Sequence, residues 1–117
     1  MAKKIAKIII DGVIEKENDN YKQEWVLDTI ETLEEKKDVV GIIVYINSPG
    51  GAVFESDEVY EALLRYKEKT KKPVYAYFAS LAASGGYYIG CAADKIIANR
   101  NTLTGSIGVI AGSFVDL

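Results

Sequence analysis

The chain alternates between short runs of β-branched hydrophobic residues and longer stretches in which hydrophobic residues recur every three or four positions. The first pattern is typical of β-strands and the second of amphipathic helices. Strands are predicted over residues 5–14, with a turn at Asp11-Gly12, and over residues 39–46, 74–78 and 95–98. Helices are predicted over about 23–36, 54–69 and 84–92, and residues 103–110 are predicted to be a loop that leads into one more strand.

The run from Val39 to Ile46 is almost continuously hydrophobic, which is typical of a strand covered on both faces of a parallel sheet. In the helix that follows, Val59, Leu63 and Tyr66 form the apolar stripe. Strands and helices that alternate in this way predict right-handed crossovers around a mainly parallel sheet. We therefore predict a single α/β domain over residues 1–117. Because the sequence stops without a further helix to cover that sheet, we interpret it as a fragment or as half of an assembly.

Composition and charge narrow the classes of function. The chain has 117 residues, with 14 basic and 17 acidic residues and a net charge of −3, so nothing suggests a nucleic-acid partner. The longest apolar run near the N-terminus, Ile8 to Ile10, is too short to span a membrane, and we expect a soluble chain as given. The single cysteine, Cys91, cannot form an internal disulfide, and we expect it to be a buried small hydrophobic residue.

Histidine is absent from the chain. This excludes Ser-His-Asp and Cys-His arrangements and most transition-metal sites. Nucleophilic catalysis would therefore need a different base, and we expect neither a metal nor a cofactor.

Two glycine-containing loops follow predicted strands. In parallel α/β folds, sites form at the carboxyl ends of strands. The first loop, Asn47 to Gly51, has paired glycines whose backbone N–H groups can point at one developing negative oxygen, as in an oxyanion hole. The alternative interpretation of the Pro-Gly-Gly sequence is a tight turn with no chemical role.

The second loop, Ala82 to Gly86, places the hydroxyl of Ser84 among small residues at the start of a predicted helix. A helix start supplies unpaired N–H groups and a positive dipole, and both stabilise an alkoxide or a tetrahedral intermediate. The alternative is that Ser84 is only a helix N-cap.

Four ordered motifs, which together extend over nearly the whole chain, resemble the signal peptide peptidase A family of serine proteases, peptidase family S49. The motifs are Tyr45-Ile46-Asn47-Ser48-Pro49-Gly50-Gly51, Ala82-Ala83-Ser84-Gly85-Gly86-Tyr87-Tyr88-Ile89, Ala92-Ala93-Asp94-Lys95-Ile96 and Leu103-Thr104-Gly105-Ser106-Ile107-Gly108-Val109. The first motif alone is less specific, because it is also similar to the Clp protease and the wider crotonase-like superfamily. The resemblance implies a ClpP/crotonase-like α/β fold, of which residues 1–117 would be the N-terminal portion and the C-terminal part would be absent.

The resemblance also implies roles for single residues. Ser84 would be the nucleophile, and Gly51 and Gly85 would donate the oxyanion N–H groups, with Gly50 as a possible substitute for Gly51. Ser106 would orient a catalytic lysine; its alternative role is a loop hydroxyl that bonds its own backbone.

In the family the general base is a lysine, which must be buried enough to be neutral. It lies farther along the chain than the residues that remain after Ser84, so we expect these 117 residues alone to be inactive. Lys95 matches the base poorly, because its strand position favours a solvated side chain.

The family further implies a peptide substrate, such as an apolar signal peptide. It also implies a homo-oligomer, and the first predicted helix, which carries Trp25, would contribute exposed apolar surface to its interface. It implies a protease domain on the extracytoplasmic side of a membrane, held by an anchor that this chain lacks.

Two alternatives remain open. One is a crotonase-like acyl-CoA enzyme, although such enzymes usually need acidic residues where this chain has alanine and glycine. The other is a non-catalytic module that oligomerises or binds a partner.

Overall fold

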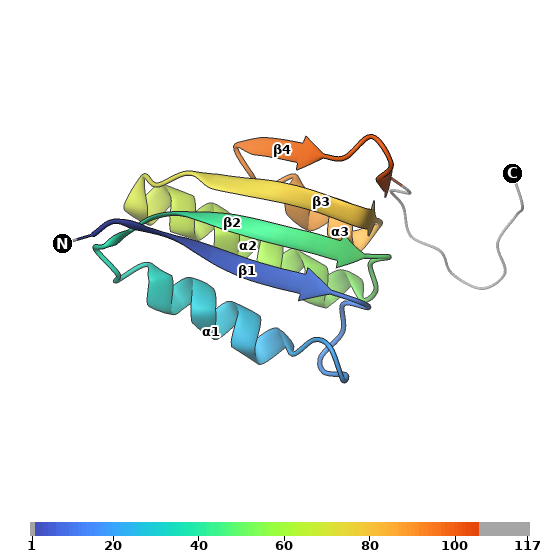
Figure 1. The fold of residues 1–117 in the computed structure, drawn as a ribbon. Coiled ribbons are helices and arrows are strands. Elements are labelled where there is room, and N and C mark those ends of the chain that lie inside the picture. The colour runs from blue at the N-terminus through green and yellow to red at the C-terminus, as the bar shows by residue number, and fades with distance from the viewer. Residues whose placement is uncertain (1, 106–117) are drawn as a thin grey trace, which may run out of the picture.

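The computed structural model describes residues 2–105, which form one parallel sheet with helices packed on it (Figure 1). The strands are β1 (Lys4–Asp11), β2 (Val39–Ser48), β3 (Val74–Ala83), β4 (Lys95–Ala98) and β5 (Leu103–Gly105). The helices are α1 (Gln23–Leu33), α2 (Val53–Thr70) and α3 (Gly85–Gly90). The predicted order of elements is therefore confirmed. The largest difference in bounds is in β3, which continues beyond its predicted end at residue 78; β1 and α1 end before their predicted ends at residues 14 and 36, and residues 103–105, predicted as a loop, form β5.

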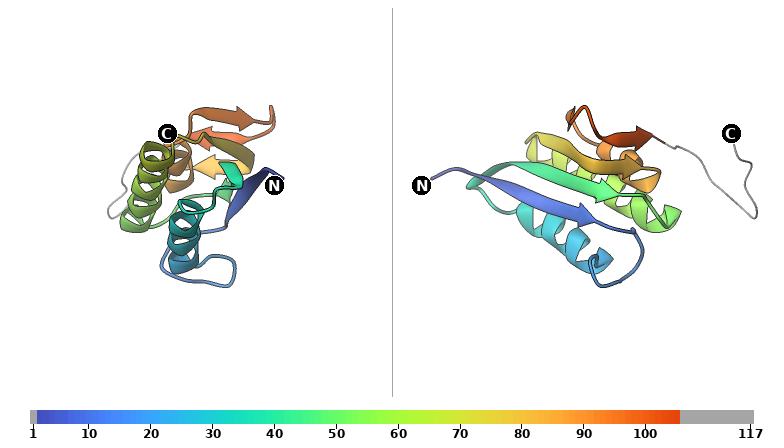
Figure 2. Two further views of the ribbon diagram at one scale, coloured as in Figure 1. Left: turned by 90° about the vertical axis from the view of Figure 1, so that its left-hand side faces the viewer. Right: turned by 45° about the vertical axis from the view of Figure 1, so that its right-hand side comes forward.

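All strand pairs are parallel, and the strands lie in the order β1-β2-β3-β4. The short strand β5 pairs with the last residues of β3, Leu81 to Ala83, beyond the part of β3 that pairs with β4. Because each successive strand is added on the same side, crossovers of one hand place every helix on one face of the sheet. Figure 2 shows this arrangement, with α1, α2 and α3 all on one side.

The core lies between the helices and the inward face of the sheet. Alternate residues of β2, such as Ile42, Val44 and Ile46, are buried there. The predicted stripe of α2, Val59, Leu63 and Tyr66, is fully buried against them, which confirms that prediction.

The opposite face of the sheet has no helix on it in residues 2–105. Tyr45 and Tyr77 stack on this face with ring centroids 5.7 Å apart, and the ammonium group of Lys7 lies 4.9 Å from the centroid of the Tyr45 ring. We expected β2 to be covered on both faces, but in the described part of the chain its second face is only half-buried. A hydrophobic run reports that a strand is central in a sheet, and it does not report which segment covers each face.

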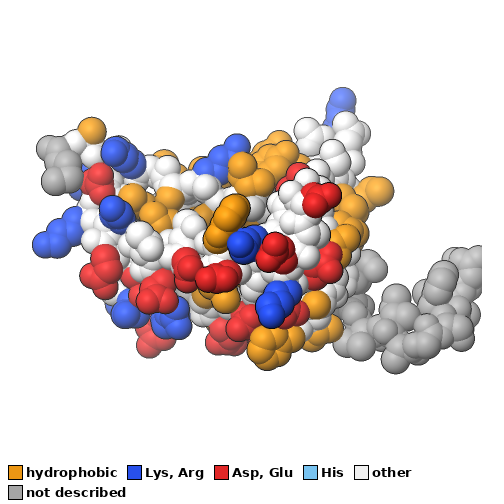
Figure 3. Space-filling view, turned by 90° about the horizontal axis from the view of Figure 1, so that it is seen from below, with side chains coloured by type: hydrophobic (Ala, Val, Ile, Leu, Met, Phe, Trp, Pro, Cys, Tyr) orange, Lys and Arg blue, Asp and Glu red, His pale blue; other side chains and the backbone are white. Residues whose placement is uncertain are grey.

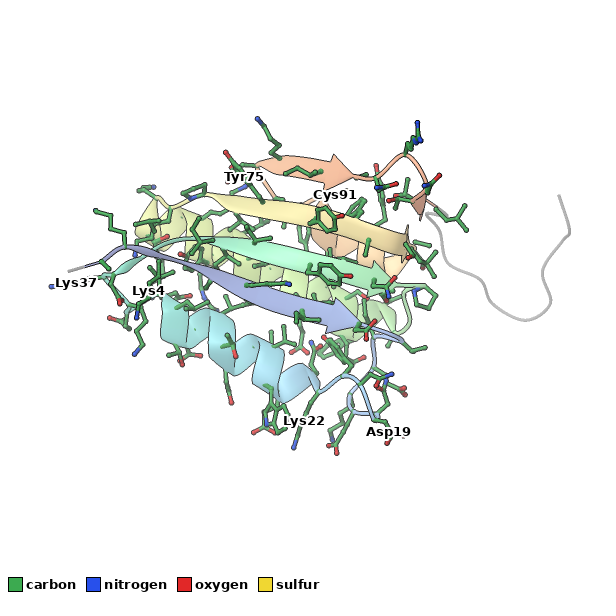
Figure 4. The ribbon with its side chains drawn as sticks, viewed as in Figure 1. Lys4, Asp19, Lys22, Lys37, Tyr75 and Cys91 are labelled. Atoms are coloured by element: carbon green, nitrogen blue, oxygen red, sulfur yellow. The ribbon has the colours of Figure 1, made fainter. Side chains whose placement is uncertain are left out.

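One expectation about a single residue turns out differently. Cys91 is exposed, so the prediction that it is buried is wrong. It follows α3 directly at the end of that helix, where the chain turns back toward the surface to enter β4 (Figure 4). Trp25, in α1, is 67% exposed, as expected for apolar surface that an oligomer would cover, whereas Val26 and Ile30 of the same helix are buried.

The helical surface carries mixed charge. Acidic and basic side chains are interspersed on the face seen in Figure 3, and hydrophobic side chains lie between them. No helix within residues 2–105 is long and apolar enough to cross a membrane.

Candidate active site

The two glycine-containing loops meet at the carboxyl end of the sheet. β2 and β3 are neighbours, so the loops that follow them lie side by side. A Cβ added to Gly50 would lie 2.6 Å from the Gly85 nitrogen and 2.7 Å from the Ser84 Cβ. Only a glycine at position 50 allows this approach, and the structure thus brings the predicted nucleophile against the predicted oxyanion loop.

Ser84 lies between the end of β3 and the start of α3, with φ 51° and ψ −119°. Residues other than glycine rarely adopt a positive φ, and backbone strain of this kind concentrates at functional sites. Its N–H donates to the carbonyl of Gly105 in β5 at 2.8 Å, and its carbonyl accepts from the Tyr88 N–H at 2.9 Å. The turn is therefore held from both sides.

The side chain of Ser84 makes no capping hydrogen bond to α3 in the described residues. Ser84 occupies the N-cap position, but the usual reason for a serine there, a hydroxyl that accepts a helix N–H, is missing. Ser84 is half-buried, and within residues 2–105 no hydrogen bond of its hydroxyl is recorded.

The backbone from Gly50 to Ala52 is bonded at both ends. The Gly50 carbonyl accepts from the Ile14 N–H at 2.9 Å, and the Ala52 N–H donates to the Ile14 carbonyl at 2.7 Å. The Gly50 N–H donates to the Ser48 Oγ at 3.0 Å, and the Ala52 carbonyl accepts from Ser56. Within residues 2–105, the backbone groups left without a recorded partner in this segment are those of Gly51.

These bonds separate the two candidate donors of the first loop. Gly50 is buried and its N–H is already used, whereas Gly51 is exposed. An added Cβ on Gly51 would collide with the Ile14 backbone, and its φ of 155° is open only to glycine. Gly85, the first residue of α3, is half-buried, and its N–H has no acceptor inside the helix.

Sequence reasoning missed two buried serines in this region. Ser48 is 0% exposed and Ser56 is 2% exposed. The burial of both serines could have been predicted from the hydrophobic patterns. Ser48 continues the inward alternation of Val44 and Ile46, and Ser56 precedes Val59 at helical spacing on the buried stripe of α2.

The protonation state of Tyr88, a residue of α3 near the site, is also defined by its contacts. The Tyr88 hydroxyl donates to the Asp57 carboxylate at 2.7 Å, and its ring stacks on Tyr60. This hydrogen bond, together with the nearby negative charge, raises the pKa of Tyr88 to about 12. Tyr88 therefore stays protonated at neutral pH and cannot serve as the base for Ser84.

No lysine in the described residues fits a buried general base, because each is exposed or half-buried. Lys95 pairs with Tyr75 at the start of β3, nine residues before Ser84, or about 30 Å along the strand. Its ammonium group lies 5.9 Å from the centroid of the Tyr75 ring, in the solvated position that we predicted. Lys4 and Lys37 also lie at the opposite end of the sheet from the strand carboxyl ends (Figure 4).

Ser106, the predicted partner of the lysine, lies outside the described residues. Within residues 2–105, no group of three or more histidine, cysteine, aspartate or glutamate residues is placed to hold a metal ion.

Comparison with known proteins bears on the family of the chain. The sequence profile of Peptidase family S49 matches residues 66–115. A putative signal peptide peptidase SppA of Enterococcus faecium is 40% identical over 115 residues, covering 92% of this chain and 33% of that protein. A putative protease of Synechocystis is 44% identical over 108 residues, covering 92% of this chain and 36% of that protein. The chain thus spans about a third of the length of these curated relatives.

Solved structures share the fold. The membrane-bound stomatin-specific protease 1510-N, as a lysine-to-alanine mutant in complex with a substrate peptide, aligns with a TM-score of 0.75 at 24% identity, covering 95% of this chain and 48% of that chain. The ClpP1 protease of Listeria monocytogenes aligns with a TM-score of 0.70 at 26% identity, covering 91% of this chain and 57% of that one. The fold is therefore the ClpP-like α/β fold, and the chain belongs to peptidase family S49, the signal peptide peptidase A family.

Proposed function

We propose that residues 1–117 form the first part of the α/β domain of a serine endopeptidase, with Ser84 as its nucleophile. The observation that carries the proposal is the strained turn at Ser84, which sits against Gly50 at the carboxyl end of the sheet. A serine is held in such a conformation at the cost of folding free energy, which is typical of functional sites, and the turn lies beside the loop that carries the proposed first donor, Gly51.

The proposed reaction is an acyl transfer in two steps. The Ser84 Oγ forms a bond to the carbonyl carbon of the peptide, and its proton passes to the base. The resulting oxyanion accepts hydrogen bonds from the N–H groups of Gly51 and Gly85. The C–N bond then breaks, the leaving amine takes the proton, and water releases the acyl group in the second step.

The proposed base is a neutral lysine beyond Leu117, oriented by Ser106. The absence of histidine from the sequence supports this assignment, as does the fact that no lysine in the described residues is buried. The geometry also argues against Lys95 as the base, because it lies near the far end of β3.

The proposed substrates are extended apolar peptides, such as signal peptides. The Enterococcus faecium relative is named a putative signal peptide peptidase, and 1510-N was solved with a substrate peptide. Near Gly51, the side chains of Val53 and Phe54 are 64% and 69% exposed, so an apolar peptide would bury hydrophobic surface at this end of α2.

We also propose that the protein forms a homo-oligomer and works on the extracytoplasmic side of a membrane. The exposed Trp25 and the half-buried second face of the sheet support self-association, since apolar surface of this kind is usually covered in the working protein. Sedimentation of the protein as a monomer at micromolar concentration would contradict the oligomer.

The decisive experiment replaces Ser84 with alanine in the full natural reading frame that contains this sequence. We expect cleavage of an apolar fluorogenic peptide to fall by about three orders of magnitude or more. Labelling by a serine-directed fluorophosphonate should be lost, while the circular dichroism spectrum is unchanged. Ser80→Ala, an exposed serine on the same strand, is the matched control and should keep both activities. Retained cleavage by Ser84→Ala would overturn the proposal.

A further inference from the structure

We propose that Ser48 and Ser56 are positioning residues that hold the two oxyanion donors, Gly51 and Gly85, at their working separation. The inference rests on the proposed function and deepens it. Both hydroxyls are buried, so neither serine touches substrate.

Ser48 controls which glycine of the first loop is free to donate. Its Oγ accepts the Gly50 N–H at 3.0 Å, two residues along the chain. A buried N–H group needs an acceptor, so without this hydroxyl the Gly50 peptide would turn toward another one. The substrate carbonyl oxygen would be one such acceptor, and Gly50 would then compete with Gly51 for it.

Ser56 connects the two donors to each other. It is the fourth residue of α2, and its Oγ donates to the Ala52 carbonyl at 2.8 Å, directly after Gly51. The same oxygen lies against Gly85, because a Cβ added to Gly85 would collide with it. One hydroxyl therefore contacts the segment that carries the first donor and the residue that carries the second.

The chemistry explains why such positioning matters. Oxyanion donors stabilise the transition state when they lie 2.7–3.1 Å from the place that the oxyanion will occupy. A misplacement of about 1 Å costs on the order of 100-fold in rate. Ground-state binding of the peptide backbone depends far less on these two N–H groups, so a misplaced donor should lower kcat and leave KM nearly unchanged.

The test compares Ser48→Ala and Ser56→Ala with the control Ser80→Ala, again in the full natural reading frame. Each variant is assayed for kcat and KM on an apolar fluorogenic peptide and for inhibition by a peptide boronate, which forms a tetrahedral adduct on the nucleophilic serine. We expect kcat to fall about 10-fold or more in both variants with KM changed less than about twofold. Boronate affinity should fall in proportion to kcat, and the control should match the parent.

Several results would overturn the inference. An unchanged kcat with only a lower melting temperature would show that the two serines are structural. A rise in KM that accounts for the whole loss would show that they act on substrate binding. If Ser48→Ala does not fold, Ser48→Cys takes its place, because it keeps the volume and offers a weaker acceptor; the same pattern is then required of it.

Failure of the inference can be told apart from failure of the proposed function. If Ser84→Ala keeps full cleavage, the nucleophile is elsewhere and the proposed function fails. If Ser84→Ala is inactive but Ser48→Ala and Ser56→Ala have unchanged kcat and boronate affinity, only the positioning role fails.

Discussion

At the carboxyl end of the sheet backbone packs directly against backbone, whereas at the amino end charged side chains join the elements. The first arrangement brings Gly50 against the Ser84 turn and Gly51 against Ile14. Glycine is what permits both contacts, since any side chain would occupy the space of a neighbouring main chain.

At the amino end, one carboxylate links α2 to the start of β3, and another links the end of α1 to α2. Asp94 accepts a hydrogen bond from the Val74 N–H at 2.8 Å and pairs with Lys67 at 3.1 Å. Glu34, just after α1, pairs with Arg65 at 3.3 Å and with Lys69 at 3.1 Å, both from α2.

The comparison teaches that the two ends should respond to change in different ways. Backbone contacts fail abruptly when one atom is added, because the main chain cannot move aside. Pairs between partly exposed charges weaken gradually, because water and salt replace them. The carboxyl end of the sheet, which carries the proposed chemistry, should therefore tolerate substitutions less well than the amino end.

The largest effect is expected for Gly51→Ala. The added Cβ would collide with the Ile14 backbone, and φ 155° is strained for alanine. We expect the free energy of unfolding to fall by about 3 kcal/mol or more. Urea denaturation monitored by circular dichroism measures it.

Gly12→Ala is the matched control, because Gly12 also has a positive φ, 80°, but its nearest neighbour would be the Asn20 side chain at 3.6 Å. We expect this variant to lose only about 1 kcal/mol, the cost of the left-handed conformation. Equal losses in the two variants would show that conformation, and not backbone contact, dominates at the carboxyl end.

A smaller effect is expected at the amino end for Asp94→Asn. The Val74 N–H, and then Lys67, hold the pKa of Asp94 below its usual range, although burial opposes the shift. Loss of the charge should cost about 1 kcal/mol, since the carboxylate is partly exposed to water.

The sign of the pH dependence follows from the lowered pKa. The folded protein prefers the deprotonated Asp94, so its contribution is complete above the unfolded-state pKa, near 4, and is lost as pH falls through the folded-state pKa. Melting temperatures of the parent should therefore drop more steeply below about pH 4 than those of Asp94→Asn. The exposed Asp28→Asn is the control and should follow the parent. Parallel curves for Asp94→Asn and the parent would contradict the assignment.

The smallest effect is expected for Glu34→Gln. The Glu34 side chain is 5% exposed, but those of its partners Arg65 and Lys69 are 54% and 57% exposed, so water screens both pairs, which together should contribute about 0.5 kcal/mol at low salt. The difference from the parent should vanish in 1 M NaCl, where the screening length is about 3 Å. Thermal melts at both salt concentrations measure it. A loss that is independent of salt would indicate a packing effect of Glu34 instead.

Much of the fold could be predicted from the sequence, because parallel strands and their helices have distinct hydrophobic periods. The run that became β2 and the stripe of Val59, Leu63 and Tyr66 are examples. The position of Ser84 at a helix start was also predictable, since small residues and a serine follow a strand there.

The rest depended on contacts between distant segments. The positive φ at Ser84 and the pairing of Ile14 with Gly51 have no local signal, because they arise from neighbours that the fold brings together. The exposure of Cys91 was missed for a related reason: small hydrophobic neighbours such as Ala92 and Gly90 are buried, but Cys91 lies on the outer side of the same turn. Composition cannot distinguish the two sides.

The bond from the Ser84 N–H to Gly105 also has a consequence for the order of assembly during synthesis. Protein chains fold from the N-terminus as they leave the ribosome. The sheet from β1 to β3 and its helices can form before residue 105 has been made, but the nucleophile turn cannot yet be tied to β5. Until then the turn has only one of its two backbone hydrogen bonds, the one that the Ser84 carbonyl accepts from the Tyr88 N–H. We therefore expect the geometry of Ser84 to be fixed last, when the third residue of β5 is in place and after the core around it has formed.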